Sequence, residues 1–271
     1  MGKRRSVTVL VNRVEGGTSR RIPDELAVEE PLEIHLDGVT VSTTMRTPGN
    51  DYELAVGFCH GDGLLGGAPV LGVRYCAAGS AVDTEFNVVT VETGGRAPVP
   101  TPRLGTTSSS CGLCGSTAIS ELTDRLVPLD PDRLAPIALA LAASMPDRVL
   151  GAQGLFGSTG AVHAAAAFTP DGSVVHLRED VGRHNAVDKV VGRLLLDHRL
   201  PANELGLFVS GRASFEMVQK AWAAGFGTLV AVSAPTELAV QTARAAGMTL
   251  VGFVRRDRYN VYAPERLSEA R

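Results

Sequence analysis

The stretch that decides the fold is residues 178–196, which read REDVGRHNAVDKVVGRLLL. Its second half carries apolar residues at the spacing of one helical face: Val187, Val190, Val191, Leu194 and Leu195. This spacing predicts a helix over residues 185–196. The first half is polar and contains Gly182, which permits a tight turn. We therefore interpret the stretch as a junction at which a strand ends and a helix begins.

Downstream of this junction, segments of strand and helix character alternate. The expected strands cover residues 205–209, 228–232 and 249–254, and the expected helices cover 214–224 and 237–246. Upstream, residues 162–168 and 173–177 flank Asp171-Gly172 and predict a hairpin. Such alternation is typical of a layered α/β domain with a partly parallel sheet.

The N-terminal half reads as strands with one helix, so the chain as a whole is α+β. Residues 32–36 and 39–43 alternate apolar and polar side chains around Asp37-Gly38, a dipeptide that favours a hairpin turn because it tolerates positive φ. The other segments expected here are a helix capped by Asn50 or Asp51 and closed by Gly61, strands over 70–75 and 86–93, and a helix over about 132–144.

The composition limits the partners and the compartment. Of 271 residues, 44% are hydrophobic and 20% are charged, and the net charge is −3. This charge gives no general attraction for nucleic acid or anionic membranes, so we expect neither as a partner. No segment approaches the roughly 20 apolar residues that cross a bilayer. The apolar run at residues 7–11 is shorter than the core of an export signal, and we expect a cytoplasmic protein.

A cysteine pair, Cys111 and Cys114, follows a segment that cannot form a core. Residues 94–110 are punctuated by Gly and Pro and end in a run of Thr and Ser, which predicts a long exposed loop. A helix is expected beyond the pair, through Ala118 and Leu122, and the N–H groups at a helix start favour a thiolate. We therefore expect a reactive thiol on a mobile loop.

Three other interpretations of the cysteine pair remain open: a zinc site, a dithiol redox pair and two inert thiols. A structural zinc site needs four ligands, and the other cysteines, Cys59 and Cys76, are isolated in the sequence. A thioredoxin-like pair follows the first strand of a βαβ unit, whereas this pair follows a Pro/Gly-rich loop.

Basic side chains gather at the expected carboxyl ends of two strands. Arg183 and His184 follow Gly182, and Arg212 follows Gly211 in the second junction. Such junctions present free helix N–H groups to anions, and two of them in one sheet meet at one edge. We therefore expect an anion or phosphate pocket there. We expect Asn185 and Asp188 on the outward helix face, where they could bind a base or a ribose.

A third polar cluster ends the last long strand of the α/β region, in the order Phe253, Val254, Arg255, Arg256, Asp257 and Arg258. An arginine side chain can donate two parallel hydrogen bonds to one phosphate group. Taken alone, each of the three clusters could equally be a capped helix or a charged surface turn. Together they indicate a ligand with several phosphates, such as a nucleotide.

One further motif invites a comparison with zinc deaminases, which use His-x-Glu followed by Pro-Cys-x-x-Cys. In His163-Ala164-Ala165, Ala165 stands in place of the glutamate, and the cysteine pair lies upstream. The general acid/base is missing, so we expect no deaminase chemistry and interpret His163 as a core histidine.

The same residues resemble a known family. Four blocks are similar to the FdhD family, the formate dehydrogenase accessory sulfurtransferases: Cys111-Gly-x-Cys114-Gly, Glu179–His184, Ser210–Lys220, and Leu250–Phe253 with its basic continuation. The resemblance covers the chain from about residue 20 onward. It implies a β-rich N-terminal domain and a cytidine-deaminase-like α/β C-terminal domain. We expect an N-terminal extension over 1–20, the first domain over 21–115 and the second over 116–271.

The resemblance also implies a function. Family members accept persulfide sulfur from a cysteine desulfurase and pass it to a molybdenum cofactor with two pterin guanine dinucleotides, Mo-bis(molybdopterin guanine dinucleotide), which then enters formate dehydrogenase. They are homodimers. Cys111 would carry the persulfide, Cys114 would assist, and residues 253–258 would bind the cofactor, which GDP-like nucleotides could mimic. Asp257 departs from a purely basic segment. The alternatives are a cofactor chaperone without chemistry, or a dithiol redox or zinc protein.

Overall fold

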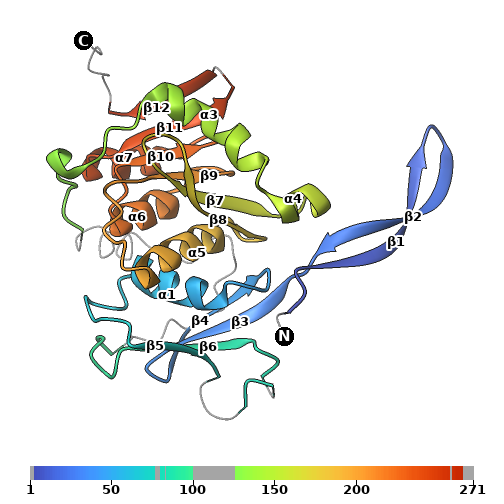
Figure 1. The fold of residues 1–271 in the computed structure, drawn as a ribbon, viewed down its shortest axis with the longest axis horizontal. Coiled ribbons are helices and arrows are strands. Elements are labelled where there is room, and N and C mark those ends of the chain that lie inside the picture. Colours follow the sequence, from blue (N-terminus) through green and yellow to red (C-terminus); the bar gives the residue numbers. More distant parts are fainter. Residues whose placement is uncertain (1–2, 77–79, 83, 100–125, 257, 265–271) are drawn as a thin grey trace.

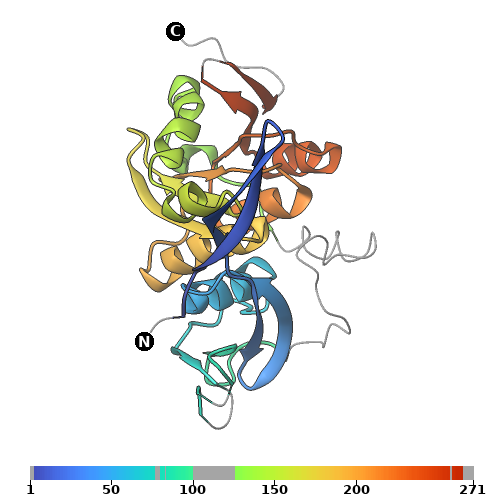
Figure 2. The ribbon, with the colours of Figure 1, turned by 90° about the vertical axis from the view of Figure 1, so that its right-hand side faces the viewer.

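The structure of the chain is a computed structural model that describes residues 3–76, 80–82, 84–99, 126–256 and 258–264. It contains a two-stranded ribbon and two larger sheets, and helices pack between the two larger sheets (Figure 1). We call residues 30–99 the N-terminal domain and residues 126–264 the C-terminal domain. Figure 2 shows the two domains stacked end to end. The predicted mixed α/β class is confirmed.

The N-terminal domain is built on a four-stranded sheet in the order β4-β3-β6-β5. Its strands are β3 (Glu30–Leu36), β4 (Val39–Arg46), β5 (Gly72–Tyr75) and β6 (Val88–Glu92). The predicted hairpin around Asp37-Gly38 is confirmed: β3 and β4 pair antiparallel, and both turn residues have positive φ, 48° and 87°.

One helix, α1 (Asp51–Gly61), covers this sheet. Leu54, Ala55 and Cys59 pack against the sheet residues Leu32, Ile34 and Val89 in one buried cluster. The helix begins after Asn50, which has a φ of 58° and makes no capping hydrogen bond through its side chain. The predicted helix is therefore confirmed, whereas the side-chain cap expected from Asn50 is absent.

The C-terminal domain contains a six-stranded sheet in the order β12-β11-β10-β9-β7-β8. The strands are β7 (His163–Phe168), β8 (Val174–Asp180), β9 (Gly206–Val209), β10 (Thr228–Ala231), β11 (Thr249–Arg255) and β12 (Arg258–Ala263). The central strands β9, β10 and β11 run parallel, and the others pair antiparallel. The predicted partly parallel sheet is confirmed.

Helices cover both faces of this sheet. The helices α5 (Arg183–Leu196), α6 (Phe215–Ala224) and α7 (Glu237–Ala246) lie on one face, and α3 (Leu139–Leu150) lies on the other, followed by the short helix α4 (Gly154–Thr159). Alternate strand residues divide between the two faces: Leu207 and Leu229 join the α5–α7 side, and Phe208 and Val230 join the α3 side.

The helix predicted over residues 132–144 is wrong. A 3-10 turn, η1 (Pro131–Arg133), is followed by extended chain, and α3 begins only at Leu139 and runs to Leu150. Pro136 explains the shift, because a proline disfavours the helical conformation of the residue before it. Ala135 accordingly donates its N–H to Asn203 O, 2.9 Å away.

The first strands form a separate two-stranded ribbon, which the sequence patterns did not predict. It consists of β1 (Ser6–Glu15) and β2 (Thr18–Ala27), contacts α4 through β2 and projects outward from there (Figure 1). The domain boundary expected after residue 20 lies inside β2. The boundary expected after residue 115 lies outside the described residues.

The two domains meet where α1 crosses α5. A Cβ atom added to Gly57 would lie 1.9 Å from Asp188 O, and one added to Gly192 would lie 1.8 Å from Glu53 O. Only glycine therefore permits the two helix backbones to approach this closely. The layers follow in the order α3, large sheet, α5–α7, α1 and small sheet (Figure 1).

Candidate functional site

The two glycine junctions of the C-terminal domain lie at one edge of the large sheet, as predicted. Because β8 and β9 both pair antiparallel with β7, they run in the same direction and end at the same edge of the sheet, on either side of the start of β7. A Cβ atom placed on Gly211 would lie 3.5 Å from His163 Nδ1 and 3.7 Å from Arg183 Cδ. The start of β7 and the residues that follow β8 and β9 are thus in direct contact.

Backbone hydrogen bonds extend this edge to the end of β11. Ser233, which follows β10, donates its N–H to Gly211 O at 3.3 Å, and Phe253 donates its N–H to Ser233 O at 3.2 Å. We call the row Arg183, Gly211, Ser233 and Phe253 the carboxyl edge. It connects the three polar clusters that the sequence predicted to share a ligand.

The basic side chains beside the carboxyl edge differ in their surroundings. Arg183 is half-buried, and its Nε atom has no hydrogen-bond partner among the residues of known placement. His184 Nε2 lies 2.5 Å from Glu216 Oε2 on α6, so this side chain is engaged within the protein. Arg212 is exposed. Arg183 and Arg212 are therefore the better candidates for contact with an anion.

The segment predicted to bind the cofactor, residues 253–258, spans the end of β11 and the start of β12: Phe253, Val254 and Arg255 end β11, and Arg258 begins β12. Phe253 is 42% exposed and has a φ of 52°, a strained value for an aromatic residue. Arg255, Arg256 and Arg258 are exposed, whereas the Val254 side chain is buried in the core beneath α3. Asp257 lies outside the described residues.

A cavity of about 490 Å³ opens beside this edge, between the sheet and helices α3 and α4. Its polar lining consists of Asp147, Gln153, His163 and Ser210. Ala164 N donates to Ser210 Oγ at 2.9 Å, and the Ser210 hydroxyl lies 3.5 Å from His163 Nδ1. Burial, aided by the charges of Arg183 and His184, holds the pKa of His163 below its usual range.

His163 is therefore not the core histidine that the sequence suggested, because it is half-buried and lines a cavity. Sequence reasoning missed Gln153 and Ser210 as cavity residues. Ser210 stood within a recognised strand-to-helix junction, which was a usable signal. Gln153 lies alone between α3 and α4, and no local pattern marks it.

Asn185 and Asp188 do not face outward, and the expectation that they bind a base or ribose is wrong. Asn185 Nδ2 donates to Met45 O at 2.8 Å and to Asp180 Oδ1 at 3.0 Å. Asp188 Oδ1 accepts a 2.7 Å hydrogen bond from Lys220 Nζ. The physical reason is that the N-terminal domain covers this face of α5, which the pattern of a single helix cannot reveal.

Part of the polar stretch at residues 179–184 supports structure rather than a ligand. Glu179 accepts hydrogen bonds from Leu155 N and Phe156 N at the start of α4, at 3.1 and 2.8 Å. Asp180 pairs with Lys189 at 2.6 Å and accepts from Thr47 N of the N-terminal domain. These carboxylates fix α4 and the domain interface, and thereby the two sides of the candidate site.

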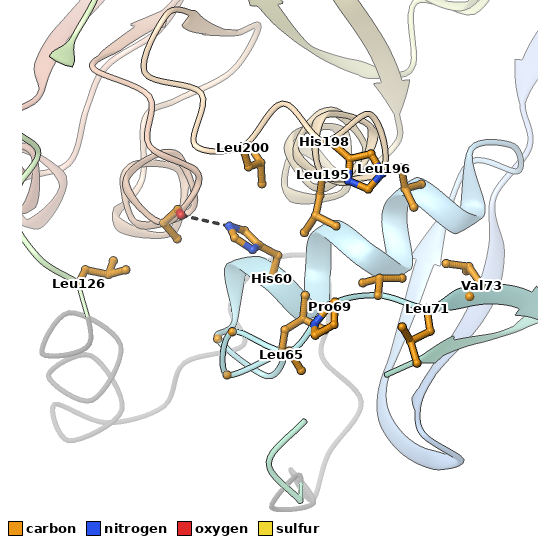
Figure 3. A pocket seen from close by; sticks show the side chains of 17 residues that line it. His60, Leu65, Pro69, Leu71, Val73, Leu126, Leu195, Leu196, His198 and Leu200 are labelled. Atoms are coloured by element: carbon orange, nitrogen blue, oxygen red, sulfur yellow. Dashed lines mark hydrogen bonds between the residues drawn. The ribbon is translucent and has the colours of Figure 1, made fainter. Parts of the chain in front are cut away.

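A larger, mostly apolar cavity of about 900 Å³ lies between the two domains on another side (Figure 3). Leu65 and Pro69 face Leu195 and Leu200 across it, and His60 Nε2 donates to Ala223 O at 3.1 Å. Leu126, the first described residue after the cysteine segment, also lines this cavity.

The predicted cysteines themselves, Cys111 and Cys114, lie outside the described residues. Cys59 and Cys76 are buried cysteines, and burial raises the pKa of Cys59 above its usual range. Within the described ranges, no group of three or more His, Cys, Asp or Glu side chains is arranged to hold a metal ion. Helices that are long and apolar enough to cross a membrane are likewise absent from the described chain.

Comparison with known proteins places these features in a family. The chain is 49% identical over 265 residues to the sulfur carrier protein FdhD of Streptomyces avermitilis, with 94% of this chain and 93% of that protein covered. The FdhD of Nocardia farcinica is 47% identical, with coverages of 94% and 91%. The FdhD of Anaeromyxobacter dehalogenans is 45% identical, with coverages of 94% and 90%.

A solved structure shares the fold. The crystal structure of a protein described as a formate dehydrogenase accessory protein, from Desulfotalea psychrophila, superposes with a TM-score of 0.78 and covers 98% of this chain and 100% of its own. The sequences are 24% identical. The predicted likeness to cytidine deaminases stays a prediction. The model of the FdhD/NarQ family matches residues 27–268, and the chain belongs to this family.

Proposed function

We propose that this chain is a sulfur carrier in the maturation of formate dehydrogenase. Cys111 accepts sulfur as a persulfide from a cysteine desulfurase and delivers it to Mo-bis(molybdopterin guanine dinucleotide) before that cofactor enters the enzyme. The observation that carries the proposal is the set of relatives named sulfur carrier protein FdhD, which are 45–49% identical to the chain and cover about nine-tenths of its length or more.

The carboxyl edge supports the cofactor half of the proposal. Arg183 and Arg212 follow β8 and β9, and Arg255 ends β11, at one side of the sheet, where arginines can each bind a phosphate oxygen pair. Free N–H groups at the starts of α5 and α6 add partial positive charge there. A cofactor with two dinucleotide arms carries several phosphates, and this set of donors suits it.

The proposed transfer of sulfur to Cys111 follows the chemistry of thiol–disulfide exchange. The Cys111 thiolate attacks the outer sulfur of the desulfurase persulfide. The bond between the two desulfurase sulfurs breaks, the desulfurase cysteine leaves as a thiolate, and Cys111 retains the outer sulfur as its own persulfide. No external oxidant is needed, because the transferred sulfur carries its oxidation state with it. Cys114 would act as the auxiliary thiol.

We propose a homodimer in the cytoplasm as the working form. The ribbon supports the dimer, because an isolated two-stranded ribbon is marginally stable and needs a covering surface. Leu10 and Val14 are 60% and 66% exposed on it. A cytoplasmic location suits a persulfide chemistry that depends on reduced thiols.

Mass spectrometry tests the proposal directly. The protein is incubated with a cysteine desulfurase and cysteine, and its intact mass and peptides are measured. We expect a gain of about 32 Da for each sulfur atom on the Cys111 peptide, reversed by a thiol reductant. Peptides that contain the buried Cys59 and Cys76 serve as internal controls.

Variants sharpen this test. Cys111→Ala should abolish both sulfur loading and activation of formate dehydrogenase in cells, while Cys114→Ala should still load sulfur. Normal activation of formate dehydrogenase by Cys111→Ala would refute the persulfide role. The cavity and the carboxyl edge would then favour the second candidate, a chaperone that shields the cofactor without chemistry. A redox-active pair or bound zinc at Cys111 and Cys114 would favour the remaining alternative, a dithiol redox or zinc protein.

A further inference from the structure

An arginine at the base of the ribbon has no partner for its charge. Arg5 directly precedes β1 and is partly buried, and its Nε atom is shielded from solvent. The Arg5 guanidinium forms no hydrogen bond or ion pair with any residue that the structure describes. Buried polar atoms in proteins are nearly always hydrogen-bonded, and an unpaired charge that is covered by protein is costly. Arg5 therefore points to a group that completes it.

Arg5 lines a cavity of about 490 Å³, which we call the ribbon-base cavity. It shares no lining residue with the cavity beside the carboxyl edge. A Cβ atom added to Gly49 would lie 3.7 Å from Arg5 Cδ, so the arginine stem rests against the turn before α1. The other walls come from that turn, from α4 and from the end of β8. The volume is within the range of sites for small molecules.

Two further charged side chains line the ribbon-base cavity, and both are already engaged. Arg178 donates to the two carboxylate oxygens of Glu53 at 2.5 and 2.9 Å, so its charge is balanced. Each Glu179 oxygen accepts one hydrogen bond from a backbone N–H of α4. A carboxylate has about four acceptor sites, so Glu179 keeps spare capacity. Arg5 and Glu179 therefore line one cavity with a free donor group and free acceptor sites, yet they form no ion pair with each other.

This arrangement selects a ligand that carries both charges. A simple anion at Arg5 would be repelled by Glu179, and a simple amine at Glu179 would be repelled by Arg5. A zwitterion satisfies both groups, because a carboxylate accepts two parallel hydrogen bonds from a guanidinium and an ammonium group donates to a carboxylate. The remaining walls include apolar surface from Ala152, Leu155 and Leu177, which can cover a side chain of the ligand.

We propose that the ribbon-base cavity binds a free α-amino acid, with Arg5 holding its carboxylate and Glu179 its ammonium group. The bound amino acid connects the base of the ribbon to β8 of the C-terminal domain, so its binding stabilises the folded chain. The site needs neither Cys111 nor the carboxyl edge, and the inference goes beyond the proposed function.

Thermal unfolding and calorimetry of the full chain test the ribbon-base cavity. The natural amino acids are added one by one, and the best of them should raise the melting temperature by at least about 2 °C. Calorimetry then compares this amino acid with the acid that lacks the ammonium group and with the amide that lacks the carboxylate. We expect each of these two analogues to bind about 10-fold or more weakly, because each leaves one charged group of the cavity unpaired.

A pair of neighbouring arginines supplies the variant and its control. Arg5→Gln removes the charge but keeps a donor, and it should weaken binding of the amino acid about 10-fold or more. Arg4 is exposed and does not line the cavity, so Arg4→Gln changes the net charge equally and should bind within about twofold of wild type.

Three results would overturn the inference: no natural amino acid binds, the two analogues bind the wild-type protein as well as the amino acid does, or Arg5→Gln binds as Arg4→Gln does. The comparison of analogues uses only the wild-type protein and decides the question even if Arg5→Gln fails to fold. The proposed function fails separately, if Cys111 takes up no sulfur.

Discussion

Lys189 Nζ lies 2.6 Å from Asp180 Oδ2, and both side chains are completely buried between the two domains. Lys189 also donates to Thr47 O of the N-terminal domain at 2.9 Å, and Asp180 accepts from Thr47 N at 3.2 Å. The pair is thus held by the same residue of the neighbouring domain. Asp180 ends β8, and Arg183 begins α5 three residues later. The ion pair therefore couples the docking of the domains to the position of the candidate anion site.

Removing one partner of this pair should destabilise the protein strongly. Asp180→Asn leaves the Lys189 ammonium buried without its counter-charge, and such changes cost about 3–5 kcal/mol. The exposed pair of Arg20 and Glu15, at 3.3 Å, is a matched control, and Glu15→Gln should cost less than about 1 kcal/mol. Urea unfolding measures both. A cost below about 1 kcal/mol for Asp180→Asn would show that the pair does not hold the interface.

The close crossing of α1 and α5 predicts that adding a side chain at this contact destabilises the protein. In Gly192→Ala the new methyl group would stand 1.8 Å from Glu53 O, so the helices must separate. We expect a loss of stability of about 1–3 kcal/mol or more. Gly157→Ala in α4 is the control, because a Cβ atom there meets nothing within 4 Å. Equal unfolding midpoints for the two variants would contradict the close approach of the helices.

Much of the C-terminal fold could be predicted because its signals are local. The apolar spacing in residues 185–196 and the turn at Asp171-Gly172 each depend on neighbours in the sequence, and both predictions are confirmed. The false helix start near residue 132 has the opposite cause. Leu134 and Ile137 continue the helical spacing, but Pro136 prevents the helix, and the backbone hydrogen-bonds to Asn203 instead.

Contacts between distant segments explain what the sequence could not show. The polar face of α5 suggested ligand contacts for Asn185 and Asp188, yet α1 and β4 cover that face. The cavity likewise combines Gln153, His163 and Ser210 from three separate segments. Only the common carboxyl edge was foreseeable, because parallel strands place their carboxyl ends together.

His60 should make the stability of the protein depend on pH. Burial holds its pKa below the usual value of about 6.5, although the hydrogen bond to Ala223 O opposes this shift and Lys220 supports it. The folded state therefore binds this proton less tightly than the unfolded state does. The stability that the neutral ring contributes is complete above pH 6.5 and is lost as pH falls through the lowered pKa.

His60→Gln removes the titration but keeps a donor for Ala223 O. In urea unfolding between pH 7.5 and 5, the variant should lose stability less steeply than wild type, by up to about 1.4 kcal/mol per pH unit. Above pH 7 the two curves should run parallel. Identical slopes below pH 6.5 would refute the assignment.

The exposed arginines of the carboxyl edge should bind phosphate groups. Arg212 follows β9 and Arg255 ends β11, and both are exposed at the edge that Ser233 connects. A lost charged hydrogen bond costs about 1.5–3 kcal/mol, which corresponds to roughly a 10-fold or greater loss of affinity. Arg212→Ala and Arg255→Ala should therefore weaken the binding of GDP and of pyrophosphate alike, as measured by calorimetry.

A matched control variant and the salt dependence of binding distinguish direct contact between arginine and phosphate from an effect of the net charge of the protein. Arg199 is exposed beyond the far end of α5, so Arg199→Ala changes the net charge equally but removes no arginine from the carboxyl edge. Added salt screens exposed charges, so GDP binding by the wild type should weaken more than binding by Arg212→Ala as salt rises. If Arg212→Ala and Arg199→Ala bind GDP equally, the carboxyl edge does not hold the phosphates.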